Sequence, residues 1–579
     1  MYGRCFSTGE WPNCLVPVEK VKVMRRWSVL WAVVVIVGIL MLTTAVTQPP
    51  DPVSVPDVAA DELASARAAA AAVDTELARL WTERSVTPAV PADELTVLRR
   101  LSLALHGTIP SLEELRMFEA DQRPDRLDHW LSTMLEDRRF ADYFAERLAR
   151  CYVGVEAGQF LIFRRDRFKA WLSEQLQTHV PYDQIVREMI AASGVWTGDG
   201  EVNFLTAAFA NGEFDPNKLT ARTTRAFLGQ RIDCAQCHDH PFDHWKQSEF
   251  EGLTAFYGKL GLTPAGVVDR RGREFRIKEA EDQEEPGRLV EPEVPFSVEW
   301  CGEGPLTREQ LAHWVTHPEN RRFERAIANR VWGLMFGKPF QQDRPVDDLP
   351  DPDFDEDLRT LDLLGADFRA HDCDLRRMIR VVAMSQAFRM SSVHPLTADV
   401  DLNETTEVER AELRQQLETV ERSWGVFPLV RLRPEQVIGS MLQATYIHTV
   451  DQNSHLIVRV MRYARENNFV EQFGDPGVDE LQDRVGTIPQ ALLRMNGQLS
   501  RELTEPNPFL ALGRIMVTSS TPEKMLETAF LVCLTRRPTV EEAAYFQEQW
   551  KGQRGSNLSD EAQDLFWDLF NSPEFSWNH

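Results

Sequence analysis

Two cysteines and a histidine near the middle of the chain form the pattern Cys-x-x-Cys-His. Cys234 and Cys237 are separated by two residues, and His238 follows directly. This pattern is typical of c-type haem attachment, in which the two thiols add to vinyl groups of the porphyrin and the imidazole ligates the iron. The chain has eight Cys and 13 His, so chance would produce the pattern in only about a few chains per thousand. The motif therefore predicts one covalently bound haem c, held by Cys234, Cys237 and His238.

Further potential metal ligands follow the motif within six positions. Together with the histidine of the motif they form a second candidate set: His238, Asp239, His240, Asp243 and His244. Sets of Cys, His and carboxylate ligands also suit Zn²⁺ or non-haem iron. A third alternative is a disulfide between Cys234 and Cys237, which an exported protein can keep. The sequence leaves the haem, another metal ion and the disulfide open.

An uncharged stretch at residues 27–47 is long enough to cross a bilayer as a helix. Four basic residues lie just before it, whereas the next basic residue after it is Arg67. The positive-inside rule therefore places residues 1–26 in the cytoplasm and the rest of the chain outside. We expect a single-pass protein of the inner membrane, with a retained anchor rather than a cleaved signal peptide. This is the side of the bacterial cytoplasmic membrane on which c-type haem is attached.

The charge and cysteine content exclude several classes of protein. The 579 residues include 64 basic and 89 acidic ones, which gives a net charge of −25. A chain of this charge has no general attraction for polyanions, so we expect no nucleic-acid partner. Eight cysteines are too few for a disulfide-built scaffold of this length. Four of them, Cys151, Cys301, Cys373 and Cys533, are predicted to form two bridges or to be free and buried.

Helical periodicity runs through most of the chain and predicts a mainly α fold. We expect two helical modules joined by a short linker, with a β-hairpin around Arg271-Gly272, after the membrane helix and a stalk. Helix signals include an Ala-rich stretch at 62–84 and a capping box at Ser111 and Glu114. The predicted boundaries are a cytoplasmic N-terminus at 1–26, the anchor at 27–47, the stalk and Ala-rich helix at 48–92, the first module at 93–265, the linker at 266–299, the second module at 300–555 and a tail at 556–579.

A block in the second module carries an arginine with two alternative roles. Arg330 lies between Asn329 and Trp332 in a stretch where cationic and apolar residues alternate. It is predicted either to contact Asp347 or Asp348 across a loop, as a buried ion pair, or to belong to a ligand site. The Asp-rich loop at 343–357 also suits Ca²⁺, although it lacks the spacing and the glycine of an EF-hand.

Two groups of segments resemble known families. RAFLGQRIDCAQCHDHPFDHWKQSEFEGLTAFYGKL at 225–260, with 101–118 before it, resembles the planctomycete-type cytochrome-like domain. Residues 323–349, 363–392, 431–442 and 488–499 are similar to the planctomycete-specific domain that usually follows it. Together the two resemblances cover about residues 93–555. They imply a secreted or surface-attached protein with a c-type haem at Cys234, Cys237 and His238, and no known reaction.

The chain departs from the family pattern in one respect that bears on function. Many relatives carry a separate cytochrome c-like module near the N-terminus, whereas this chain has a single Cys-x-x-Cys-His in all. Two classes of function remain. The first is a membrane-anchored redox or electron-transfer protein with a periplasmic redox or surface protein as partner. The second is a non-haem metal-binding or structural surface module that presents a partner.

Overall fold

The computed structural model describes most of the chain after residue 58. The described residues are 59–155, 161–277, 287–353, 358–398, 400, 405–454, 456–474, 481, 487–496, 498–508, 510–553 and 555–579. The predicted anchor at 27–47 and the cytoplasmic segment before it lie outside this set. Within it, no helix combines the length and the apolar character that crossing a bilayer requires.

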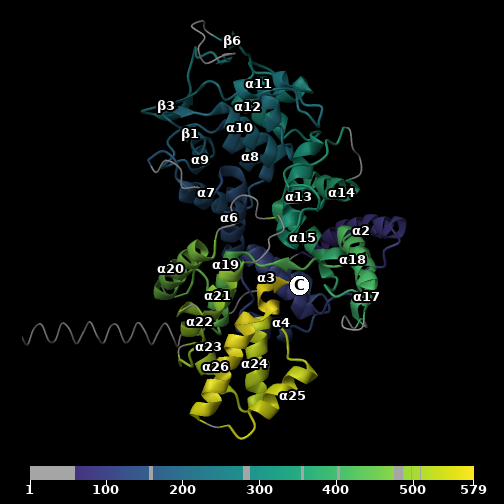
Figure 1. Cartoon of the computed structure of the whole chain (residues 1–579). Helices are drawn as coiled ribbons and strands as arrows, with labels where there is room; N and C mark the ends of the chain where they lie inside the picture. The colour runs from purple at the N-terminus through teal and green to yellow at the C-terminus, as the bar shows by residue number, and fades with distance from the viewer. Residues whose placement is uncertain are drawn as a thin grey trace, which may run out of the picture. The chain divides into compact units, whose positions relative to one another are not determined.

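The described residues are mainly helical, which confirms the mainly α character of the prediction (Figure 1). The helices before the first long hairpin are α2 (Ala60–Glu83), α3 (Glu94–His106), α4 (Leu112–Ala120), α5 (Arg126–Glu136), α6 (Arg138–Val153), α7 (Arg165–Gln177), α8 (Tyr182–Ala191), α9 (Asn203–Thr206), α10 (Pro216–Thr223) and α11 (Gln247–Ala255). Short helical turns lie between them and after them: η1 (Gly200–Val202), η2 (Thr224–Leu228), η3 (Asp233–Gln236) and η4 (Val298–Cys301).

The helices that follow fall into two groups by their packing. Those of the first group are α12 (Arg308–Val315), α13 (Arg321–Phe336), α14 (Arg359–Ala370), α15 (Leu375–Met384), α16 (Gln386–Arg389), α17 (Pro395–Ala398) and α18 (Glu407–Arg422). Those of the second group are α19 (Pro434–Ala444), α20 (Leu456–Phe473), α21 (Ile488–Asn496), α22 (Gln498–Thr504), α23 (Ala511–Thr518), α24 (Pro522–Leu534), α25 (Val540–Gln549), α26 (Ser556–Asn571) and α27 (Pro573–Ser576).

Two apolar cores hold these helices together. The first is built almost entirely from residues between Leu63 and Phe427, and the second mainly from residues between Leu432 and Phe575. Val267 and Val294 of the predicted linker are buried in the first core. The helices on both sides of the linker therefore share one core, and the second core adds Leu103 and Ile109 to residues that follow position 431.

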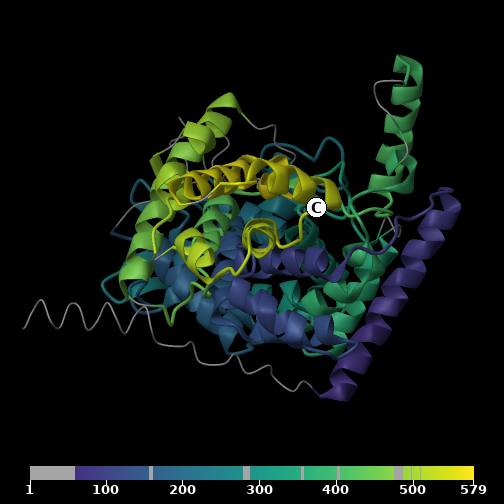
Figure 2. The same cartoon turned by 90° about the horizontal axis from the view of Figure 1, so that it is seen from below.

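Helix α2 shows how the sequence pattern produces packing. Its buried residues recur every three or four positions, and they are Leu63, Ala66, Ala70, Val73, Leu77 and Trp81. This spacing places them along one stripe of the helix, and the stripe packs against α14 and α15. The indole of Trp81 also donates a hydrogen bond to the carbonyl of Ser423 at 2.8 Å. The predicted Ala-rich helix is therefore docked on the body, where it appears in purple in Figure 2.

Helix ends form where the sequence predicts them. The hydroxyl of Ser111 accepts a hydrogen bond from the backbone of Glu114, and the Glu114 carboxylate accepts one from the backbone of Ser111, at 3.1 and 2.8 Å. This confirms the capping box at the start of α4. Helix α3 ends at Gly107, whose φ of +69° and close contact with the Tyr143 ring leave no space for a side chain.

The strands form four short antiparallel pairs in the described part of the chain. They are β1 (Phe209–Ala210) with β2 (Glu213–Phe214), β3 (Leu260–Thr263) with β4 (Gly266–Asp269), β5 (Arg276–Ile277) with β6 (Arg288–Leu289), and β7 (Val430–Arg431) with β8 (Trp577–Asn578). The β7–β8 pair joins the chain end to the segment between the two cores.

The β3–β4 hairpin corrects the predicted position of the linker hairpin. Its turn lies at residues 264–265, and Arg271-Gly272 forms the turn after β4 instead. The earlier turn is selected because Val267 is buried and exchanges two backbone hydrogen bonds with Gly194, at 2.7 and 3.0 Å. This contact with a distant segment cannot be read from the local turn signals.

We expect the substitution Leu77→Ala to lower the free energy of unfolding by about 2–4 kcal/mol, because it leaves a cavity in the stripe of α2. Chemical denaturation of the full chain measures this difference. The control Thr75→Ala lies on the exposed face of the same helix and should change stability by less than about 0.5 kcal/mol. Equal effects of the two substitutions would contradict the docking of α2.

Asp74 gives α2 a pH-dependent contribution to stability. Burial raises the pKa of its carboxyl group to about 6, although the hydrogen bond from the backbone of Gln386 opposes the shift. The folded protein therefore holds this proton more tightly than the unfolded chain, and stability falls as the pH rises through about 6. We expect Asp74→Asn to be more stable than the unmodified chain at about pH 7.5 and to lose this advantage below about pH 5.

Denaturation at the two pH values measures the effect of Asp74→Asn, and Asp61→Asn on the same helix is the control. Asp61 is exposed, so its replacement should bring no gain in stability at the higher pH. An Asp74→Asn variant whose stability relative to the unmodified chain is the same at both pH values would refute the assignment.

Candidate functional site

The Cys-x-x-Cys-His motif lies on a surface turn. Cys234 is part of η3, and Cys237 ends this turn, with its backbone N–H 3.5 Å from the carbonyl oxygen of Cys234. Ile232 and Ala235 are buried and hold the turn against the first core, whereas the motif's own three residues are exposed. Both cysteines are free thiols. The structure thus places the three predicted haem-binding residues together, open to solvent.

The ring of His238 is oriented by a backbone carbonyl. Its Nδ1 lies 2.7 Å from the carbonyl oxygen of Asp239, and a carbonyl can only accept, so Nδ1 carries the proton. The lone pair of the neutral ring is then on Nε2. Histidines that ligate metals are commonly oriented in this way, by a hydrogen bond from the other ring nitrogen. His238 is therefore in the tautomer that could ligate iron through Nε2.

The other four predicted ligands are engaged within the loop. Asp239 accepts a hydrogen bond from the backbone of Gln247 at 3.0 Å, at the start of α11. His240 uses its Nδ1 to accept from the backbone of Phe242, at 3.3 Å. Asp243 Oδ1 accepts from the backbone and from Nδ1 of His244, at 2.7 and 2.6 Å.

These bonds occupy polar atoms of the predicted metal ligands within the loop. Across the described residues, no group of three or more His, Cys, Asp or Glu side chains is arranged so that it could hold a metal ion. The structure therefore does not assemble the second candidate set into a preformed site.

The end of the loop is fastened to the interior by Trp245. This residue is buried, its Nε1 donates to Gln230 Oε1 at 3.3 Å, and Gln230 in turn donates to the carbonyl of Leu349 at 2.8 Å. The ring of His244 packs on Trp245, with centroids 4.7 Å apart. The loop is thereby held against the segment after α13.

An ion pair beneath the loop was not anticipated from the sequence. His244 Nε2 lies 3.6 Å from Asp351, whose carboxylate receives two hydrogen bonds from the buried guanidinium of Arg322, at 2.5 and 2.9 Å. Arg322 and Asp351 are 29 positions apart in the sequence, so no local sequence pattern predicts that they pair. Their only sequence signal is the combination of an arginine in an apolar helix with an Asp-rich loop.

Phe242 gives the loop an apolar surface. Its side chain is 94% exposed, and it lies four residues after His238. A single exposed apolar side chain is common on protein surfaces. Here, however, it belongs to the same short loop as two free thiols and an oriented imidazole, so a flat apolar group bound at these residues would have an apolar partner within reach.

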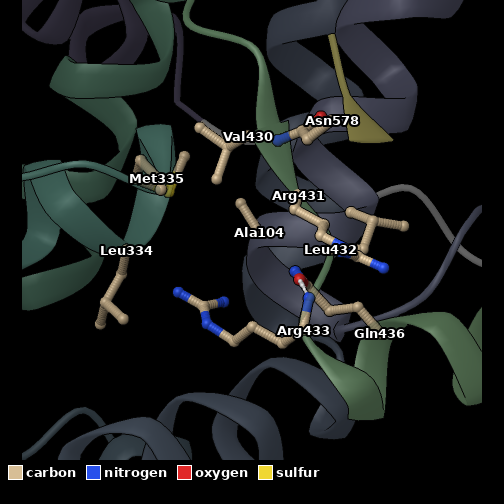
Figure 3. Close-up of a pocket in the computed structure, with 10 residues that line it drawn as sticks. Ala104, Leu334, Met335, Val430, Arg431, Leu432, Arg433, Gln436 and Asn578 are labelled. Atoms are coloured by element: carbon tan, nitrogen blue, oxygen red, sulfur yellow. Dashed lines mark hydrogen bonds between the residues drawn. The ribbon is translucent and has the colours of Figure 1, made fainter. Parts of the chain in front are cut away.

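Two cavities bear on what the protein can bind. The smaller has a volume of about 30 Å³ and lies between α3, α13, α19 and the β7–β8 pair (Figure 3), with room for about two water molecules. The larger has a volume of about 460 Å³, and six of its fifteen lining residues are basic. Cys234, Cys237 and His238 line neither of them.

The remaining cysteines of the described chain differ from the motif. Cys301, Cys373 and Cys533 are free thiols, so the alternative of two disulfide bridges is not realised. Burial raises the pKa of Cys301 to about 11 and that of Cys373 to about 12. These thiols stay protonated at neutral pH and are poor nucleophiles.

Comparison with known proteins yields two family matches. Residues 72–261 match the model of PSCyt2, described as a protein of unknown function (DUF1549). Residues 307–550 match the model of PSD1, also described as a protein of unknown function (DUF1553). No curated protein and no solved structure matches the chain.

The exposure of the motif predicts fast thiol chemistry. In the haem-free full chain, Cys234 and Cys237 should react with Ellman's reagent under native conditions, and Cys234→Ala/Cys237→Ala should remove two fast-reacting thiols. The control Cys301→Ala/Cys533→Ala removes buried thiols and should leave the fast phase unchanged. Equal fast phases in the first variant and the unmodified chain would show that the motif is not accessible.

Proposed function

Because the chain belongs to the proteins that combine a PSCyt2 domain with a PSD1 domain, both of unknown function, we propose its function from the site itself. The protein is an exported, membrane-anchored carrier of a single covalent haem c that serves electron transfer. The observation that supports this most strongly is the pair of free, exposed thiols next to a histidine whose Nδ1 is bonded to a backbone carbonyl.

Each residue of the motif has a defined task in this proposal. Cys234 and Cys237 would hold the porphyrin through thioether bonds, and His238 would ligate the iron through Nε2. The carbonyl of Asp239 keeps the imidazole in the required tautomer. The haem supplies one-electron redox chemistry when it is bound. Phe242 offers its exposed ring as an apolar contact for the macrocycle.

The location follows from the N-terminal segment. Residues 27–47 anchor the chain in the inner membrane, and the positive-inside rule places the body on the outer side. Haem attachment takes place on that side. The partner is a periplasmic redox or surface protein, which meets the haem at the exposed turn rather than inside the body.

Spectroscopy of haem-loaded protein tests the proposal. The full chain, produced together with a haem-maturation system, should show a Soret absorption band that stays with the denatured polypeptide and a band that stains for haem peroxidase on a denaturing gel. Cys237→Ala should lose covalent haem, and the control Cys301→Ala should keep it. His238→Ala should keep the thioether at reduced yield and change the spectrum, because the chain would no longer supply this imidazole to the iron.

A colourless full-length preparation would overturn the haem proposal. Metal analysis of that preparation then separates the alternatives, since zinc or non-haem iron in stoichiometric amount would indicate a metal-binding module. Absence of metal would leave a structural surface module that presents a partner.

A further inference from the structure

The larger cavity concentrates positive charge in an acidic protein. It lies between α6, α10, η2, α13 and the segment after α13, and its volume is about 460 Å³. Six basic side chains line it: Arg222, Arg225, Arg231, Arg330, Lys338 and Arg344. Among the described lining residues, two are acidic, Asp343 and Asp347. The chain as a whole has a net charge of −25. The positive charge of the cavity lining is therefore opposite in sign to the net charge of the protein.

Three of these basic residues form ion pairs with carboxylates of the described chain. Arg231 pairs with Asp347 at 2.7 Å, within the lining. Arg225 pairs with Asp233 and Lys338 with Glu421, at 2.7 and 2.6 Å, and these two carboxylates lie outside the lining. The described residues of the lining alone, six basic and two acidic, carry a formal charge of +4.

Arg330 is the buried cation of the cavity. It is 5% exposed, and its Nε and Nη2 atoms have no hydrogen-bond partner in the structure. Two other buried arginines of the same helix are bonded to carboxylates, Arg322 to Asp351 and Arg325 to Asp362. Burial without partners disfavours a charged group strongly. The nearby Asp347 is already bonded to Arg231, so the protein itself leaves two donors of Arg330 unused.

The guanidinium of Arg330 remains charged in this setting. Burial by itself lowers its pKa, but the acidic groups around it, among them Asp347, raise the pKa above the ordinary value of arginine. A charged planar group with unused N–H donors matches the geometry of a phosphoryl, sulfuryl or carboxylate group, which accepts two parallel hydrogen bonds.

We propose that this cavity is a binding site for a small multivalent oxyanion, with Arg330 as its buried anchor and Arg344 at its exposed side. The volume falls in the range of small-molecule sites, and the formal charge of +4 on the described lining residues suits a ligand with two or more negative charges. The site is separate from the haem motif, because Cys234, Cys237 and His238 are absent from its lining.

Calorimetric titration of the haem-free full chain with pyrophosphate, citrate and chloride tests the proposal. Pyrophosphate or citrate should bind with saturation, and chloride should only compete weakly. Arg330→Gln should weaken binding by about 30-fold or more, since it removes the buried charge. Arg344→Gln, at an exposed position, should weaken it by about two- to fivefold. If citrate binds more tightly than pyrophosphate, the site is assigned to carboxylate ligands. If pyrophosphate binds more tightly, the site is assigned to phosphoryl ligands.

Controls separate anion binding from folding and from haem attachment. Thermal melting of Arg330→Gln should show no loss of stability without anion, because two of the donors it removes have no partner. Arg422→Gln lies on the exposed face of α18 and should bind like the unmodified chain. Cys234→Ala/Cys237→Ala should also bind normally.

Three results would overturn the proposal. The first is the absence of saturable binding of either multivalent probe to a folded, unmodified chain. The second is unchanged binding by both Arg330→Gln and Arg344→Gln. The third is loss of binding in Cys234→Ala/Cys237→Ala, which would make the cavity part of the haem site.

Discussion

The burial of α13 is the constraint on which the rest of the structure depends. Every residue from Arg322 to Phe336 is buried, although the helix carries several arginines. A charge inside a protein needs a partner, and the segments around α13 are arranged to supply one. Asp351 meets Arg322 and Asp362 meets Arg325. Arg330, further along the helix, faces a cavity in place of a carboxylate.

Helix α13 contributes residues near both candidate sites, which differ in their chemistry. On one side, Asp351 accepts hydrogen bonds from Arg322 and lies beside His244, so the loop that carries the Cys-x-x-Cys-His motif packs against an ion pair of α13. On the other side, Arg330 contributes charge to the basic cavity. The thiols and imidazole of the motif are exposed, as attachment of a cofactor to a folded chain requires. Arg330, which is the proposed anchor of the cavity, is buried.

Local signals in the sequence predicted the parts of the structure that depend on neighbouring residues. The capping box of α4 and the Ala-rich helix α2 both depend on residues within a few turns of chain. The predicted position of the linker hairpin was wrong, because the hairpin is fixed by backbone hydrogen bonds with Gly194, which is distant in the sequence. The five candidate metal ligands were predicted because they are close together in the sequence. In the structure, three of them, Asp239, His240 and Asp243, instead accept hydrogen bonds from backbone N–H groups of the same loop or of the helix that follows it. The unused donors of Arg330 depend on tertiary packing, and the sequence could only offer a ligand site as one of two alternatives.

The central claim is that this chain carries one haem through two thioether bonds. Intact-mass spectrometry of the full chain, made with a haem-maturation system and denatured before measurement, tests it most directly. The account predicts a mass above that of the polypeptide by one haem group, and a proteolytic peptide containing residues 232–247 that carries the added mass. A polypeptide mass without any haem increment, from folded protein produced under conditions that mature a known c-type cytochrome, would contradict it.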